Sequence, residues 1–197
     1  MTYSIITKQF ARTIWTKYIK ALEEYKLISD GDIIYLASST EAKQTLANYL
    51  VEMTAEYGIR NITIVYDEEA EHNKIVASES FHDIIYNNLW EMLYNGRIHS
   101  QIPKETKDDV TIIRPLCLVR DEHILEWQQT SGQKLSVADR SEELSLIKNL
   151  VDRLAAGNDA VENNIFASMS NVDIEMLPGH IKDGIHHSFL EWYGQKR

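Results

Sequence analysis

Short apolar segments alternate with amphipathic stretches up to Leu116, and this alternation constrains the fold more than any other feature. Several segments predict strands because they are short, rich in β-branched residues and bounded by polar or turn residues. They are Ile33–Ala37, Ile62–Tyr66, Ile75–Ala77 and Thr111–Leu116. Strands that alternate with helices form parallel sheets with right-handed crossovers. We therefore expect an α/β fold, with a parallel sheet of about four to five strands and flanking helices.

The stretches between these segments carry apolar residues at helical spacing. One helix is predicted over residues 8–27, a second over Leu46–Tyr57 before Gly58, and a third over 83–94. The segment Gly96–Asp109 is polar and predicts a loop. Two later apolar stripes, at Leu144–Leu154 and Val161–Met169, predict a helical C-terminal third. We expect a single domain, 1–197, in which 1–130 form the α/β core and 131–197 a helical extension.

Composition limits the class of protein. Hydrophobic residues make up 44% of the chain and prolines number three, which is typical of a globular protein. No apolar run approaches a membrane span, and the N-terminus lacks the apolar core of a secretory signal. The single cysteine, Cys117, predicts no disulfide and no zinc site, and is expected to be buried as a small hydrophobe. We expect a cytoplasmic protein.

Residues 72–124 contain a series of short motifs in a recognisable order. They read HNKIVASESFHDIIYNNLWEMLYNGRI, then IIRPLCLVRDEHI. This series resembles the tRNA 2-thiocytidine synthetase family of PP-loop ATP pyrophosphatases, whose members carry N-K-I-A-L-G, H-H-x-D-D-x-x-E-T, Y-G-G-R-I, I-R-P-L and V-R-E-x-D-I. The segment Asn164–Val172, NIFASMSNV, is similar to the family's N-I-F-x-S-M-S-N-V. The shared residues are Asn73, Lys74, Ile75, Ala77, Asp83, Met92, Tyr94, Gly96, Arg97, Ile98, Arg114, Pro115, Leu116, Val119, Arg120 and Ile124.

The residues that carry chemistry in that family differ in this chain. Glu79 and Ser80 replace the His-His pair, His82 replaces the first Asp, and Tyr86 and Asn87 replace the Glu-Thr pair. The resemblance therefore implies a shared PP-loop fold, in a degenerate and shortened member. It implies neither ATP pyrophosphatase nor thiolation activity.

The loop after the first strand differs in the same way. The family's loop reads S-G-G-x-D-S, and its glycines let backbone N–H groups close on pyrophosphate. Here Ser39-Thr40-Glu41-Ala42-Lys43-Gln44 stands in register, so Thr40 and Glu41 crowd the phosphate and Lys43 replaces the acid. Two interpretations stay open: a residual anion pocket of Ser38, Ser39, Thr40 and Lys43, or a plain Ser or Thr helix N-cap.

Three further residues complete the candidate nucleotide or anion site: Asp83, Arg97 and Arg114. Arg114 is expected at the carboxyl end of a strand, where open α/β sheets bind ligands. It either pairs with a buried carboxylate, for which Asp83 is the candidate, or binds an anion. His82 next to Asp83 is expected to be solvent-exposed or to cap a helix, because neighbours on a helix rarely form a catalytic base and its orienting group.

Cofactors and partners follow from the same comparison with the family. Many family members bind an iron–sulfur cluster through cysteines that this chain lacks, so we expect no iron–sulfur cluster, no zinc and no other metal. ATP or AMP stays a candidate ligand. The net charge of −10 argues against general nucleic-acid binding. A basic N-terminal helix with Lys8, Arg12, Lys17 and Lys20 either contacts tRNA or is a solvated helix face.

Two functions therefore stay open. The first is a binding or scaffold protein whose partner is tRNA or another protein. The second is a nucleotide-dependent enzyme of tRNA modification with altered adenylation chemistry. The sequence also leaves a homodimer open. Loss of the loop glycines and of the loop Asp favours the first function.

Overall fold

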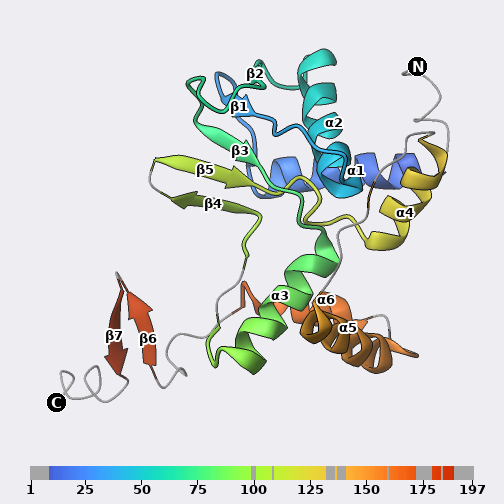
Figure 1. Ribbon diagram of the computed structural model, residues 1–197, viewed down its shortest axis with the longest axis vertical. Helices are drawn as coiled ribbons and strands as arrows, with labels where there is room; N and C mark the ends of the chain where they lie inside the picture. The colour runs from blue at the N-terminus through green and yellow to red at the C-terminus, as the bar shows by residue number, and fades with distance from the viewer. Residues whose placement is uncertain are drawn as a thin grey trace.

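A mostly parallel five-stranded sheet forms the centre of the protein, in the order β2-β1-β3-β5-β4 (Figure 1). The computed structural model describes residues 9–98, 101–107, 109–131, 136, 141–158, 160–171, 179–182 and 184–188. The strands of this sheet are β1 (Ile33–Tyr35), β2 (Thr63–Val65), β3 (Lys74–Val76), β4 (Lys104–Lys107) and β5 (Val110–Ile113). β4 pairs antiparallel with β5, and the other pairs are parallel. The predicted α/β class and strand number are confirmed.

Three helices build the main core with the sheet: α1 (Gln9–Glu24), α2 (Ala42–Glu56) and α4 (Asp121–Thr130). α1 buries Ile14, Tyr18 and Leu22 at the predicted helical spacing, and α4 contributes Trp127. Cys117 is fully buried beside them, as predicted, and burial raises the pKa of its thiol to about 12.

A second apolar cluster lies between α3 (Phe81–Tyr94), α5 (Glu142–Ala155) and α6 (Ala160–Ser168). Figure 1 shows these three helices together, to one side of the sheet. α3 joins both cores, because Ile84 packs in the main core while Phe81 and Ile85 pack in the second. The predicted helices of the C-terminal part are confirmed.

Two elements differ from the prediction. β4 lies inside the segment Gly96–Asp109 that was expected to be a loop, because the polar sequence KETK lacks the apolar alternation of a half-buried strand. β4 is a strand because it pairs antiparallel with β5. Asp109, between the two strands, has a positive φ of 70°. The C-terminal third also contains a hairpin of β6 (Gly179–Lys182) and β7 (Ile185–Ser188). The sequence pair Asp183-Gly184 is a hairpin signal that the helical expectation passed over.

The two ends of the parallel strands differ: a buried ion pair lies at the amino end, and a topological switch point lies at the carboxyl end. At the amino end, Lys74 Nζ lies 2.6 Å from Asp32 Oδ2 and donates to the Leu27 carbonyl oxygen at 2.7 Å. β2 lies on one side of β1 and β3 lies on the other, so the order in which strands are added to the sheet reverses between β1 and β3. The carboxyl ends of these two strands therefore form a topological switch point. Such a switch point opens a crevice in which α/β sheets bind ligands.

Among the described residues, no helix is both long and apolar enough to cross a membrane.

Candidate functional site

A cavity of about 370 Å³ lies at this switch point, where α2 and α3 begin. Its walls come from the starts of α2 and α3, the segment after β3, and α4, with one residue of α5. The lining residues are Glu41, Ala42, Lys43, Ser78, Glu79, Asp83, Tyr86, Asn87, Asp121, Ile124, Leu125, Gln128 and Leu144. The cavity has the location of a nucleotide site in folds of this kind.

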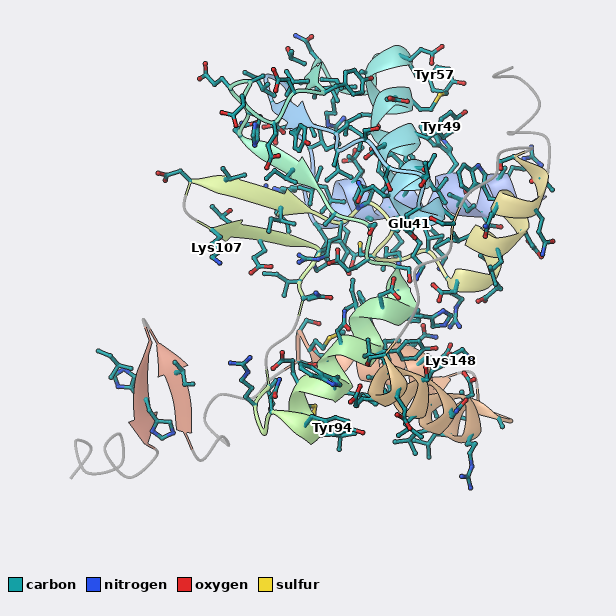
Figure 2. All side chains as sticks on the ribbon, in the orientation of Figure 1. Glu41, Tyr49, Tyr57, Tyr94, Lys107 and Lys148 are labelled. Carbon is teal, nitrogen blue, oxygen red and sulfur yellow. The ribbon has the colours of Figure 1, made fainter. Side chains whose placement is uncertain are left out.

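The N-terminus of α2 is capped by a carboxylate from its own loop. Glu41 has extended backbone angles, and its side chain accepts hydrogen bonds from the backbone N–H groups of Lys43 at 3.1 Å and Gln44 at 2.9 Å. The predicted Ser or Thr cap is therefore wrong: Ser39 Oγ accepts from the Glu41 N–H at 3.0 Å, outside the helix. Ser38, Ser39 and Thr40 are exposed. Figure 2 labels Glu41 near the middle of the molecule, at the start of α2.

Lys43 lies at the centre of a charged cluster. Its Nζ is 2.5 Å from Asp83 Oδ2, 3.0 Å from Asp121 Oδ1 and 3.1 Å from Ser80 Oγ. The lysine and both aspartate side chains are 17–20% exposed. Two carboxylates therefore already hold the ammonium that was expected to bind an anion.

Ser80 fixes the start of α3 and links the cluster. Its side chain accepts from the Asp83 N–H, and the Asp83 carboxylate accepts from the Ser80 N–H at 3.0 Å, which makes a capping box. Ser80 Oγ also lies 2.6 Å from Asp121 Oδ1 and is fully buried. The positive end of α3 is thus covered by its own Asp83, as that of α2 is by Glu41.

His82 is buried, so the expected solvent exposure is wrong, whereas the expected capping role agrees with its contact to the first N–H group of α4. Its Nδ1 accepts from the Asp121 N–H at 3.1 Å, and its Nε2 lies 3.3 Å from Glu162 Oε1. An accepting Nδ1 assigns the proton of a neutral imidazole to Nε2, facing Glu162. Glu162 also pairs with Arg120. His82 therefore connects α3 to the start of α4 and to α6.

Arg114 directly follows β5 and is buried, as expected for the carboxyl end of a strand. Its Nη1 donates to the Ile102 carbonyl oxygen at 2.7 Å, and its Nη2 and Nε lie 3.2 and 3.3 Å from Glu105 and Glu79. The prediction that Arg114 pairs with Asp83 is wrong, because Lys43 pairs with Asp83 and these glutamates pair with Arg114.

The remaining candidate residues lie outside this cavity. Arg97 follows the C-terminus of α3 and pairs with Glu91 at 2.7 Å, about 20 Å along the helix from Asp83. Lys8 lies outside the described residues. Arg12, Lys17 and Lys20 have exposed side chains on α1, and Lys20 pairs with Glu24 at 3.8 Å.

Ser80, Asp121 and Glu162 were not proposed as site residues from the sequence, and the role of Glu41 was not foreseen. Ser80 and Asp83 match the capping-box pattern S-x-x-D, and Asp121 stands at the acidic position of the V-R-E-x-D-I motif, so both signals were present. Glu41 was expected to repel phosphate, but not to cap the helix. Glu162 had no signal, because only the packing of α6 on α3 brings it to His82.

The chain is similar to known proteins in sequence and in fold. No family model matches the chain. The chain is 32% identical over 125 residues to tRNA-cytidine(32) 2-sulfurtransferase 2 of Francisella tularensis subsp. tularensis (strain WY96-3418). It is also 32% identical over 125 residues to tRNA-cytidine(32) 2-sulfurtransferase 1 of Francisella philomiragia. The chain is homologous to these tRNA sulfurtransferases. The alignments cover 60% of this chain and 48% and 47% of the two relatives, so the chain spans about half of their length.

The homology agrees with the fold. The U34-tRNA thiolase NcsA from Methanococcus maripaludis, solved with its [4Fe-4S] cluster, superposes with a TM-score of 0.60 at 12% identity. The match covers 88% of this chain and 81% of the thiolase. The residues of this homologue do not fit such a cluster, since clusters of this type are held by several cysteine thiolates and the chain has one buried cysteine. Among the described residues, no three His, Cys, Asp or Glu side chains are grouped to hold a metal ion.

Proposed function

We propose that this homologue of tRNA sulfurtransferases is a binding protein without ATP pyrophosphatase or thiolation activity. The observation that supports this most is the Glu41 carboxylate on the Lys43 and Gln44 N–H groups. In a PP-loop these amides face phosphate, and the partial positive charge of the helix N-terminus favours the anion. The Glu41 carboxylate already accepts the hydrogen bonds of these amides and neutralises the charge of the helix N-terminus, so both are taken before a phosphate can bind.

The charges around the loop support the same proposal. A nucleotide phosphate entering the crevice would meet Glu41, Asp83 and Asp121, while the nearest ammonium, Lys43, is bound to the two aspartates. Moving Lys43 to a phosphate would take its ammonium away from two partly buried carboxylates. The likeness to tRNA sulfurtransferases then supports a binding role, for which tRNA is one candidate partner.

A calorimetric and thermal titration with Mg-ATP tests the proposal. Binding stabilises a protein by RT ln(1 + [L]/Kd), so millimolar ATP at micromolar affinity would add about 4 kcal/mol to the free energy of unfolding. We expect no such stabilisation and no release of AMP or pyrophosphate. Glu41→Gln removes the charge of the cap, and Glu56→Gln, at an exposed acid at the other end of α2, is its matched control. ATP-dependent release of pyrophosphate by the wild-type protein would refute the proposal.

A nucleotide-dependent enzyme with altered adenylation chemistry is the second candidate. The ordered cluster of Lys43, Ser80, His82 and Asp121 beside a cavity supports it, because active sites bring such titratable groups together. Chromatography of ATP incubated with the protein and bulk tRNA separates the two candidates. AMP formed by the wild type and lost in Lys43→Met would establish the enzyme.

A further inference from the structure

We propose that β2 is the surface through which two copies of this chain associate. The two β2 strands pair antiparallel about a two-fold axis at Ile64 and join the two five-stranded sheets into one continuous sheet. The sequence left a homodimer open, and this edge gives it a location. The partner surface lies outside the crevice, so the proposal does not depend on the proposed loss of ATP chemistry.

β2 forms one edge of the sheet and β4 forms the other (Figure 1). Among the described residues, β2 has β1 as its strand partner on one side and no strand on its other side. An edge strand presents a row of backbone N–H and C=O groups that can pair with another chain. Charged residues and proline usually protect such edges, and Thr63–Val65 contains neither.

The hydrogen bonds to β1 determine which backbone groups of β2 face outward. The Thr63 N–H donates to the Asp32 carbonyl oxygen at 2.9 Å, and the Val65 carbonyl oxygen accepts from the Leu36 N–H at 3.0 Å. Backbone groups of successive strand residues point to alternate sides, so the N–H and C=O of Ile64 point away from β1. Ile64 is the middle residue of β2, and its two groups therefore lie at the centre of the free edge.

This direction selects one register for two identical strands. In an antiparallel pair, two residues whose backbone groups face each other exchange both N–H···O bonds. With Ile64 opposite Ile64 of the second copy, Thr63 lies opposite Val65, and all three residues of each strand are paired. A register centred on Thr63 or on Val65 would leave one residue of each strand unpaired.

The side chains beside the edge fit this register. Ile62 and Ile64 pack partly against the main core. Tyr66 is 66% exposed, and its hydroxyl donates to Glu52 of α2 at 2.9 Å. Extending the register by two residues places Ile62 opposite Tyr66 of the second copy. Pairs of an aromatic and a β-branched side chain stabilise antiparallel strands, so the exposed Tyr66 ring gains an apolar neighbour.

Charge at the two ends of β2 favours the antiparallel arrangement. Arg60 precedes the strand, and the acidic run DEE at 67–69 follows it. Antiparallel pairing brings Arg60 of each copy towards the acidic end of the other, whereas parallel pairing would bring the two acidic runs together. Arg60 already donates to Glu23 at 2.5 Å and to the Ile59 carbonyl oxygen at 2.9 Å. A guanidinium has five N–H donors, so it can also attract a carboxylate of the second copy.

Analytical ultracentrifugation over a range of protein concentrations tests the proposal. The expected result is a monomer–dimer equilibrium with a Kd on the order of 10–100 µM, because a single strand edge makes a small interface. Ile64→Pro removes the outward N–H of both copies and should weaken dimerisation at least about tenfold. Proline is tolerated at an edge position whose N–H faces solvent, and the Tm of the variant checks that it is folded.

Thr106→Pro, on the opposite edge of the sheet, is the matched control. The Arg114 N–H donates to the Pro103 carbonyl oxygen at 2.9 Å, so alternation along β4 turns the Thr106 N–H away from β5. The substitution therefore removes an outward N–H from β4 in the same way. Thr106→Pro should dimerise like the wild type.

A pair of cysteine variants tests the register. Thr63 and Val65 of opposite copies form a non-hydrogen-bonded pair, whose Cα atoms lie ~4.5 Å apart and within the span of a disulfide. Thr63→Cys mixed with Val65→Cys should give a cross-linked dimer under mild oxidation, and either variant alone should give little. Cys117 does not compete, because it is fully buried.

The proposal is overturned if the wild type stays monomeric at roughly 1 mM protein, or if Ile64→Pro dimerises like Thr106→Pro. It is also overturned if either cysteine variant alone cross-links as well as the mixture does. The Mg-ATP titration is independent of these outcomes. ATP turnover would refute the proposed function, and a monomer would refute the β2 interface alone.

Discussion

The two charge clusters at opposite ends of the sheet differ in their burial and in their balance of charge. At the amino end, one ammonium, Lys74, meets one carboxylate, Asp32, and the two side chains are 6% and 10% exposed. At the carboxyl end, Lys43 meets both Asp83 and Asp121, and the side chains are about twice as exposed, at 17–20%. The first cluster is closed and neutral, and the second has excess negative charge beside a cavity. The difference separates a largely buried ion pair from a cluster that solvent partly reaches.

The largest expected effect is at the closed pair. Lys74→Met leaves Asp32 buried without its cation and should lower the free energy of unfolding by about 3–5 kcal/mol. Denaturation by urea measures it. Lys74→Met with Asp32→Leu should lose less than the sum of the two single variants, because the stranded charge is gone. Additive losses would show that the two side chains are not coupled, and would contradict the description of Lys74 and Asp32 as a closed ion pair.

The next largest effect on stability is expected at the open cluster, which consists of Lys43, Asp83 and Asp121. Lys43→Met should cost about 2 kcal/mol, since Lys43 donates to charged acceptors that solvent can partly reach. High salt should recover part of this loss, because counter-ions can enter the cavity. Salt should recover little in Lys74→Met, which is its matched control. Equal salt responses would contradict the distinction between a closed and an open cluster.

A smaller effect is expected at the helix cap beside the open cluster. Glu41→Ala should cost about 1 kcal/mol by leaving two α2 amides without an acceptor. Glu41→Ser keeps a capping oxygen and removes the charge, so it should retain most of the stability. Thermal denaturation of both variants measures the difference. A full loss in Glu41→Ser would show that the charge, rather than the cap, stabilises α2.

The smallest effect on stability concerns the basic face of α1. Replacing Lys8, Arg12, Lys17 and Lys20 by Gln should change the free energy of unfolding by less than about 0.5 kcal/mol. If this face contacts tRNA, filter retention of tRNA at ~50 mM salt should be lost, because phosphate contacts depend on these charges. Lys107→Gln and Lys148→Gln, labelled on other elements in Figure 2, are the controls. No retention by the wild type would favour a protein partner.

Much of the fold could be predicted from the sequence, because the strand runs and helix stripes are local patterns. Ile33–Tyr35 and Lys74–Val76 lie within or next to predicted segments for this reason. β4 could not be predicted from the sequence, because Lys104–Lys107 forms a strand only through its pairing with β5. Of the residues proposed for the site, Lys43 and Asp83 line the cavity, and their pairing was not predicted. Lys43 reaches Asp83 across two crossovers, and side-chain distances over such sequence separations have no local signature.

The charged edge strand also bears on how copies of this protein can associate. β4 forms one edge of the sheet, and three of its four residues, in KETK, are charged. If two copies extended the sheet antiparallel through this edge in symmetric register, Lys104 of one would lie opposite Lys107 of the other. Like charges directly opposite each other destabilise strand pairing, and lysines on edges oppose aggregation. β4 thus opposes the association of two copies through this edge of the sheet.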